Sequence, residues 1–93
     1  ELIGGQRAFL LRVRGDSMTG DGVADGDLIL VRPQATAQDG EVVVVIVNGE
    51  ATVKRLYRTR GGFRLESSNP AYGPIVAPEV EVVGKVDLCL HRL

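Results

Sequence analysis

The sequence contains a single cysteine, Cys89, a single histidine, His91, and no tryptophan. One cysteine cannot form an internal disulfide, which excludes a disulfide-stabilised scaffold and favours a reducing, cytoplasmic compartment. The longest apolar run, 42–47, falls far short of the roughly 20 residues that a membrane-spanning helix requires, so we expect no membrane association. With 11 basic and 12 acidic residues, the net charge of −1 excludes the strongly basic surface typical of a nucleic-acid-binding domain.

The remaining composition is that of one small globular domain. Of the 93 residues, 44% are hydrophobic and 25% are charged, which supports a buried core and excludes a disordered or collagen-like chain. The first residue is Glu1 instead of methionine, and no signal-peptide pattern follows. We therefore expect this chain to be a piece of a longer protein.

Glycine and proline interrupt the sequence at short intervals, and β-branched runs lie between them. The alternation in these runs predicts strands at 9–14, 27–32, 41–48, 51–57 and 63–66, with one or two more within 80–93. The run 42–47 indicates a strand buried on both faces, and Asn48-Gly49 predicts a tight hairpin turn after it. A single helical turn between residues 17 and 24 is the most that the glycines there allow. We expect an all-β fold, one small domain of antiparallel strands and hairpins in a partly barrel-like sheet arrangement.

Metal ligation is the first chemistry to consider, because four aspartates lie close together in the sequence: Asp16, Asp21, Asp25 and Asp27. Segment 21–27 lacks the spacing and the closing glutamate of a calcium loop, and aspartates in such segments commonly accept hydrogen bonds in turns. Cys89 and His91 would face the same way in a strand, but no Cys-x-x-Cys pair or second histidine completes a zinc site. The sequence therefore predicts no metal site and no cofactor, and it disfavours a histidine-dependent hydrolase.

The segment Gly15-Asp16-Ser17-Met18 follows a predicted strand and precedes a glycine-rich turn. A serine in such a turn can present its hydroxyl while nearby backbone N–H groups converge on one point, as a nucleophile and an oxyanion hole require. The same three residues, Gly-Asp-Ser, are also ordinary turn residues. Taken alone, the segment favours an ordinary turn over a nucleophile site.

A lysine can activate a serine when no histidine is available, provided that burial lowers its pKa. The chain has only two lysines, Lys54 and Lys85. Lys54 lies in a predicted strand beside the most hydrophobic one, and alternation groups it with Thr52 and Leu56 without showing which face is buried. A lysine whose ammonium extends to solvent is the alternative.

Four ordered blocks resemble the carboxy-terminal domain of LexA-type repressors, a family that also includes UmuD-type mutagenesis proteins and phage repressors. These blocks are Gly15-Asp16-Ser17-Met18, Asp25-Gly26-Asp27-Leu28, Gly49-Glu50-Ala51-Thr52-Val53-Lys54-Arg55-Leu56 and Asn69-Pro70-Ala71-Tyr72-Gly73-Pro74-Ile75. The 37 positions between Ser17 and Lys54 are the separation that this family uses. The resemblance covers nearly the whole chain, from about residue 9 to residue 93.

The resemblance implies a self-cleaving serine protease. Ser17 matches the nucleophile and Lys54 the general base, while the backbone N–H groups of Asp16 and Ser17 would form the oxyanion hole. Members of the family cut themselves at an Ala-Gly or Cys-Gly bond upstream of the serine, and neither pair occurs in this sequence. We therefore expect residues 1–8 to be the remnant of the linker and cleavage region, and residues 9–93 to form the autoprotease and dimerisation domain.

The resemblance also implies partners. The parent would be a repressor of the DNA-damage (SOS) response, cleaved when a RecA–single-stranded-DNA filament acts as co-protease, and it would bind operator DNA through an amino-terminal domain absent from this chain. Two copies would pair through the carboxy-terminal strand, 86–93, as a homodimer. The alternatives are a UmuD-like subunit of a translesion polymerase, the carboxy-terminal domain of a phage repressor, and a non-enzymatic β-module.

Overall fold

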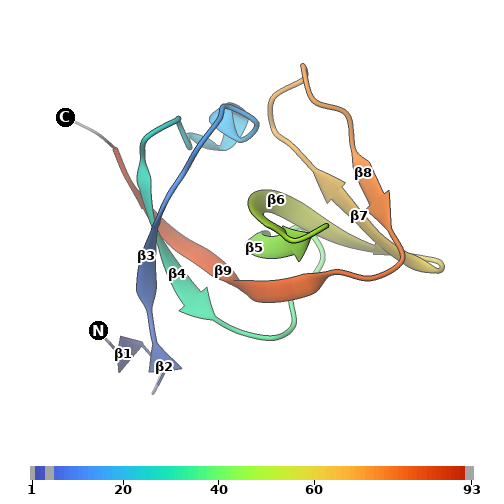
Figure 1. Ribbon diagram of the computed structural model, residues 1–93, viewed down its shortest axis with the longest axis horizontal. Coiled ribbons are helices and arrows are strands. Elements are labelled where there is room, and N and C mark those ends of the chain that lie inside the picture. The colour runs from blue at the N-terminus through green and yellow to red at the C-terminus, as the bar shows by residue number, and fades with distance from the viewer. Residues whose placement is uncertain (1, 4–5, 92–93) are drawn as a thin grey trace.

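The computed structural model describes residues 2–3 and 6–91, and seven antiparallel strands form its main sheet, in the order β3-β4-β9-β5-β6-β7-β8 (Figure 1). These strands are β3 (Phe9–Arg12), β4 (Leu28–Pro33), β5 (Val42–Val47), β6 (Glu50–Thr59), β7 (Gly62–Glu66), β8 (Ile75–Ala77) and β9 (Glu81–Leu90). A second, two-stranded sheet pairs β1 (Leu2–Ile3) with β2 (Gln6–Arg7). The helical content of the described residues is one 3-10 turn, η1 (Thr19–Asp21), and none of them forms a helix that could span a membrane.

The all-β prediction is confirmed, and each predicted strand is present with small shifts in its ends. The sheet curves so that β3 and β4 lie on one side and β7 and β8 on the other, but it stays open, with β3 and β8 at its edges (Figure 1). Segment 80–93 contributes one strand, β9, to residue 90. The short strand β8 was not predicted, because prolines at 74 and 78 flank its three residues.

The hairpin of β5 and β6 turns at Asn48 and Gly49, as predicted, and both residues have positive φ, 51° and 82°. The turn sets the register, so Val47 lies opposite Glu50 and Val43 lies opposite Lys54. Because neighbours in register share a face of the sheet, Lys54 lies on the same face as the fully buried Val43.

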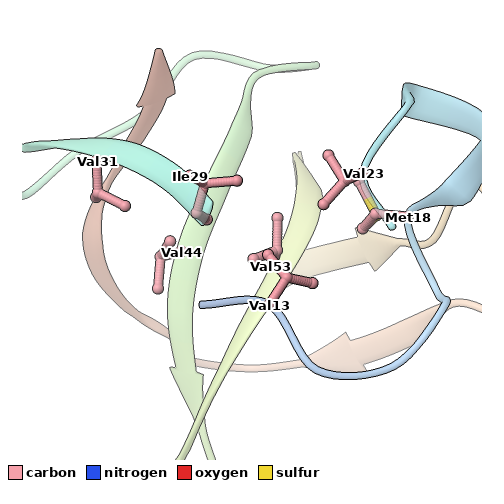
Figure 2. Packing of buried hydrophobic residues seen from close by; sticks show 7 residues of the cluster. All are labelled: Val13, Met18, Val23, Ile29, Val31, Val44 and Val53. Atoms are coloured by element: carbon pink, nitrogen blue, oxygen red, sulfur yellow. The ribbon is translucent and has the colours of Figure 1, made fainter. Parts of the chain in front are cut away.

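The hydrophobic core has two parts, one on each face of β5. The first contains Val44, and the second contains Val43 and Val45, which confirms the prediction that this strand is buried on both faces. Figure 2 shows the first part, to which β4, β5, β6 and segment 13–23 contribute side chains: Val13, Met18, Val23, Ile29, Val31, Val44 and Val53. Met18 is 2% exposed, so its burial anchors the chain directly after Ser17.

The carboxy-terminal strand β9 lies inside the sheet, between β4 and β5. Its first half pairs with β5, from Glu81 to Lys85, and its second half pairs with β4 as far as Leu90. Residues 86–90 match the expected edge strand, since they have β4 on one side and no strand on the other among the residues that the structure describes. His91 is not part of the strand, and residues 92–93 of the expected edge lie outside the described residues.

Candidate functional site

Ser17 lies in a turn beyond the end of β3. Four positions before it, Val13 makes backbone hydrogen bonds to the far end of this turn. The Val13 N–H donates to the Asp27 carbonyl, and the Gly26 N–H donates back to the Val13 carbonyl, each at 2.8 Å. These two bonds hold the chain closed around segment 14–25, where Gly15 has a φ of 89° that favours glycine. Ser17 therefore lies in a turn past the end of β3, where the sequence placed it relative to the predicted strand.

Lys54 lies in the middle of β6 and is 6% exposed. Its Nζ donates a hydrogen bond to the Oγ of Ser17 at 2.8 Å. Burial lowers the pKa of Lys54, since removing the ammonium from water disfavours its charged form. No ion pair among the described residues involves Lys54, so no carboxylate there stabilises its charge.

The backbone on the amino-terminal side of Ser17 is held from outside the turn. The side-chain amide of Asn69 donates to the Asp16 carbonyl at 2.9 Å, and the Tyr72 hydroxyl donates to the Asp16 carboxylate at 2.5 Å. This second bond raises the pKa of Tyr72, because the phenol proton is held by a carboxylate. Within the described chain, neither the Asp16 nor the Ser17 backbone N–H donates to another protein group, so both remain available as hydrogen-bond donors.

Two hollows adjoin the Ser17–Lys54 pair, one of about 150 Å³ on the side of Ser17 and one of about 250 Å³ on the side of Lys54. Thr52 lines both hollows. The second hollow is also lined by Ser67, whose Oγ is buried and has no hydrogen-bond partner in the described structure. Sequence reasoning did not identify Asn69, Tyr72 or Ser67 as parts of this site.

Cys89 and His91, dismissed as too few for a metal site, lie beside a third donor. Both contact the Asp27 carboxylate, which is buried directly before β4. Burial, followed by the contact with Asp27, raises the pKa of the Cys89 thiol. The remaining aspartates of that region have structural contacts: Asp25 accepts from the Gly15 N–H, and Asp21 pairs with Arg55.

Comparison with known proteins places the chain among peptidases. The model of the Peptidase S24-like family matches residues 1–87, and the chain belongs to this family. The resemblance to LexA-type repressors is confirmed by three relatives, each called LexA repressor. The LexA repressor of Caldicellulosiruptor saccharolyticus is 42% identical over the whole of this chain, and the match covers 46% of that relative's length. Those of Geotalea uraniireducens and Geobacter metallireducens are 49% and 50% identical over 91% and 92% of the chain, each with 44% of its own length covered. The chain thus spans less than half the length of these relatives.

Proposed function

We propose that this chain is the self-cleaving protease domain of a LexA-type repressor, with Ser17 as nucleophile and Lys54 as general base. The observation that carries the proposal is the 2.8 Å contact between the Lys54 amine and the Ser17 hydroxyl, at a lysine that is 6% exposed. A lysine used only for solubility would extend its ammonium into water, whereas a base for serine must lose its proton near neutral pH.

The reaction follows from these positions. Neutral Lys54 accepts the Ser17 hydroxyl proton while Oγ attacks the carbonyl carbon of the target peptide bond. The resulting oxyanion binds the N–H groups of Asp16 and Ser17. The tetrahedral intermediate collapses to an acyl-enzyme as protonated Lys54 donates its proton to the leaving amine. A water molecule then attacks the ester, Lys54 takes the water's proton, and Ser17 is released with its hydroxyl restored.

The hollow lined by Ser17 and the hollow lined by Lys54, which share Thr52, would hold the substrate residues on either side of the scissile bond. Family members cut a bond between small residues, and we extend that preference to this chain. Residues 1–8 would then belong to the linker and residues 9–93 to the protease domain. A RecA–single-stranded-DNA filament would promote cleavage, and operator DNA would bind through a separate amino-terminal domain of the parent protein.

A homodimer through the second half of β9 is part of the proposal. The side of residues 86–90 that faces away from β4 is open for another strand. Beside it lies an apolar hollow of about 440 Å³, with exposed hydrophobic side chains from β3 and β9: Phe9, Leu10, Leu88 and Leu90. Pairing with a second copy would cover both features, since bare strand edges and apolar patches favour association.

The experiment that tests this function uses a synthetic peptide with an Ala-Gly bond, taken from the region upstream of the serine in the parent protein. The 93-residue chain should cleave it slowly, and Ser17→Ala and Lys54→Ala should abolish cleavage. Lys85→Ala is the matched control, because Lys85 is the only other lysine and pairs with Glu41 at 3.0 Å. Its rate should equal that of the unchanged chain.

The rate should also rise about tenfold per pH unit until the pH exceeds the pKa of Lys54, because only the neutral amine acts as base. Full cleavage by Lys54→Ala, or a rate that does not change with pH, would show that Lys54 is not the base.

A further inference from the structure

Three side chains of different chemistry meet at the end of β9, away from the Ser17–Lys54 pair. The Cys89 Sγ lies 3.4 Å from the Asp27 Oδ2, and the His91 Nδ1 lies 2.8 Å from the same oxygen. One donor atom from each residue lies within 4.8 Å of the other two. The register of the sheet produces this arrangement, because Ile29, two positions after Asp27, pairs with Cys89.

One of these separations matches a tetrahedral metal site, and the other two require a movement of His91. A zinc ion with bonds of about 2.0–2.3 Å holds its ligand atoms about 3.3–3.8 Å apart. The Sγ–Oδ2 separation already lies in that range. The His91 ring must move by about 0.5 Å away from the Asp27 Oδ2 to reach the same range, and its ligand nitrogen, within 4.8 Å of the Cys89 Sγ, must also come into that range. The His91 side chain is 64% exposed and has the freedom to move.

We propose that Asp27, Cys89 and His91 bind one zinc ion. Binding replaces the thiol proton of Cys89, which passes to solvent, with a sulfur–zinc bond. The His91 Nδ1 and an Asp27 carboxylate oxygen supply two more bonds. A thiolate with an imidazole selects zinc or a similar transition metal over magnesium and calcium, which prefer oxygen ligands alone.

The fourth ligand is a water molecule. The exposed side of His91 opens the site to solvent, and three protein ligands with a water are a common zinc coordination. Asp27 is held in place for this role, since the Ala24 N–H donates to its Oδ2 at 2.8 Å. Such a contact to a ligating carboxylate orients it toward the metal.

Zinc in this position would connect the last strand to the turn that follows Ser17. Asp27 ends that turn, and the Cys89 Sγ also lies 3.9 Å from the carbonyl oxygen of Gly22, directly after η1. The site would therefore restrain the turn from its far end. The proposal stands independently of the protease assignment, because no residue of the Ser17–Lys54 pair takes part.

Titration of the 93-residue chain with Co²⁺, as a spectroscopic substitute for Zn²⁺, tests the proposal under a non-chelating reductant. We expect one equivalent to bind with a near-ultraviolet thiolate-to-cobalt band and intense visible bands of a tetrahedral ion, and Zn²⁺ to displace it. Cys89→Ser should remove the thiolate band, and His91→Gln should weaken binding more than about 100-fold, beyond the loss typical of residues outside the ligand shell.

Asp25→Asn is the matched control, since Asp25 lies in the same turn but contacts the Gly15 N–H instead of the cluster. It should bind Co²⁺ as the unchanged chain does. The proposal is wrong if Co²⁺ gives no thiolate band, or if the band persists in Cys89→Ser. Equal binding by His91→Gln and the unchanged chain would also overturn it.

Discussion

The backbone N–H of Asn69 donates to the carbonyl oxygen of Ser17 at 3.0 Å. Its side-chain amide donates to the preceding carbonyl, that of Asp16. Because a trans peptide directs its carbonyl and its N–H to opposite sides, holding the Asp16 carbonyl also fixes the direction of the Ser17 N–H. In the proposed reaction that N–H stabilises the oxyanion, so Asn69 is a positioning residue.

Asn69→Asp should therefore lower kcat for peptide cleavage by about 10–100-fold while KM changes little, since a misdirected donor affects the transition state more than substrate binding. The carboxylate still accepts from the Ala71 N–H, as the Asn69 Oδ1 does at 2.9 Å, but cannot donate to the Asp16 carbonyl. Steady-state kinetics measure the effect. Gln34→Glu, the same change at a residue that lines neither hollow beside the pair and whose amide donates to the Thr36 carbonyl, should leave kcat unchanged. An unaltered kcat in Asn69→Asp would exclude a positioning role.

Burial of Lys54 also predicts how stability depends on pH. Its pKa is lowered in the folded chain, so between that value and the ordinary lysine pKa of about 10.4 the unfolded state binds a proton that the folded state has released. The free energy of unfolding should therefore rise with pH across this interval. It should be lowest below the folded pKa, where the buried amine must carry charge.

Lys54→Met should remove that rise and be more stable than the unchanged chain at neutral pH, as expected when a buried unpaired cation is replaced by an apolar side chain. Urea unfolding between about pH 6 and about pH 10 measures this. Lys85→Met should retain the slope. If the free energy of unfolding of Lys54→Met changes with pH in the same way as that of the unchanged chain, Lys54 does not titrate with a lowered pKa.

The dimer proposal predicts that a charge on the apolar patch prevents association. Leu88 is 52% exposed on β9, and Leu88→Glu should give a monomer without loss of folding. Sedimentation at micromolar concentration should report twice 10.0 kDa for the unchanged chain. Val76→Glu is the control, because Val76 is 73% exposed on β8, an edge strand that does not pair with β9. This variant should remain dimeric. A monomeric unchanged chain would contradict the proposal.

Gly84 should not tolerate a side chain. A Cβ at this position would overlap the Arg32 carbonyl oxygen and lie 2.7 Å from the Val31 Cγ1, both on the adjacent strand β4. Gly84→Ala should lower the free energy of unfolding by about 1–3 kcal/mol. Gly73→Ala, whose Cβ meets no atom within 4 Å, should change it by less than about 0.5 kcal/mol. Denaturant unfolding of the two variants gives the comparison, and equal stabilities would refute the packing argument.

The strands could be predicted because each depends on local alternation and turn residues, as in the hairpin at Asn48 and Gly49. The order of the strands in the sheet could not be predicted, because it depends on which distant segments of the chain pair. Nothing in segment 80–93 shows that it lies between β4 and β5. The contact of Asp27 with Cys89 and His91 follows from that pairing and was missed for the same reason.

The proximity of Ser17 and Lys54 was expected from the family resemblance and not from the local pattern. Alternation could not show the buried face of β6 because both faces are buried: Val53 is 8% exposed and Lys54 6%. Asn69 and Tyr72 reach Asp16 from the connection between β7 and β8, whose path depends on the curvature of the whole sheet (Figure 1).

The place of β9 has a consequence for how the chain folds. As it emerges during synthesis, β4 and β5 have no common neighbour until residues 81–90 arrive, although the β5–β6 hairpin that carries Lys54 can form early. Closing such long-range pairings carries an entropic cost that slows folding. The turn that holds Ser17 ends at β4, which pairs with β9, so Ser17 gains its final support only after β9 has been made. A ribosome-bound chain that ends before residue 81 should therefore be unable to cleave the Ala-Gly peptide.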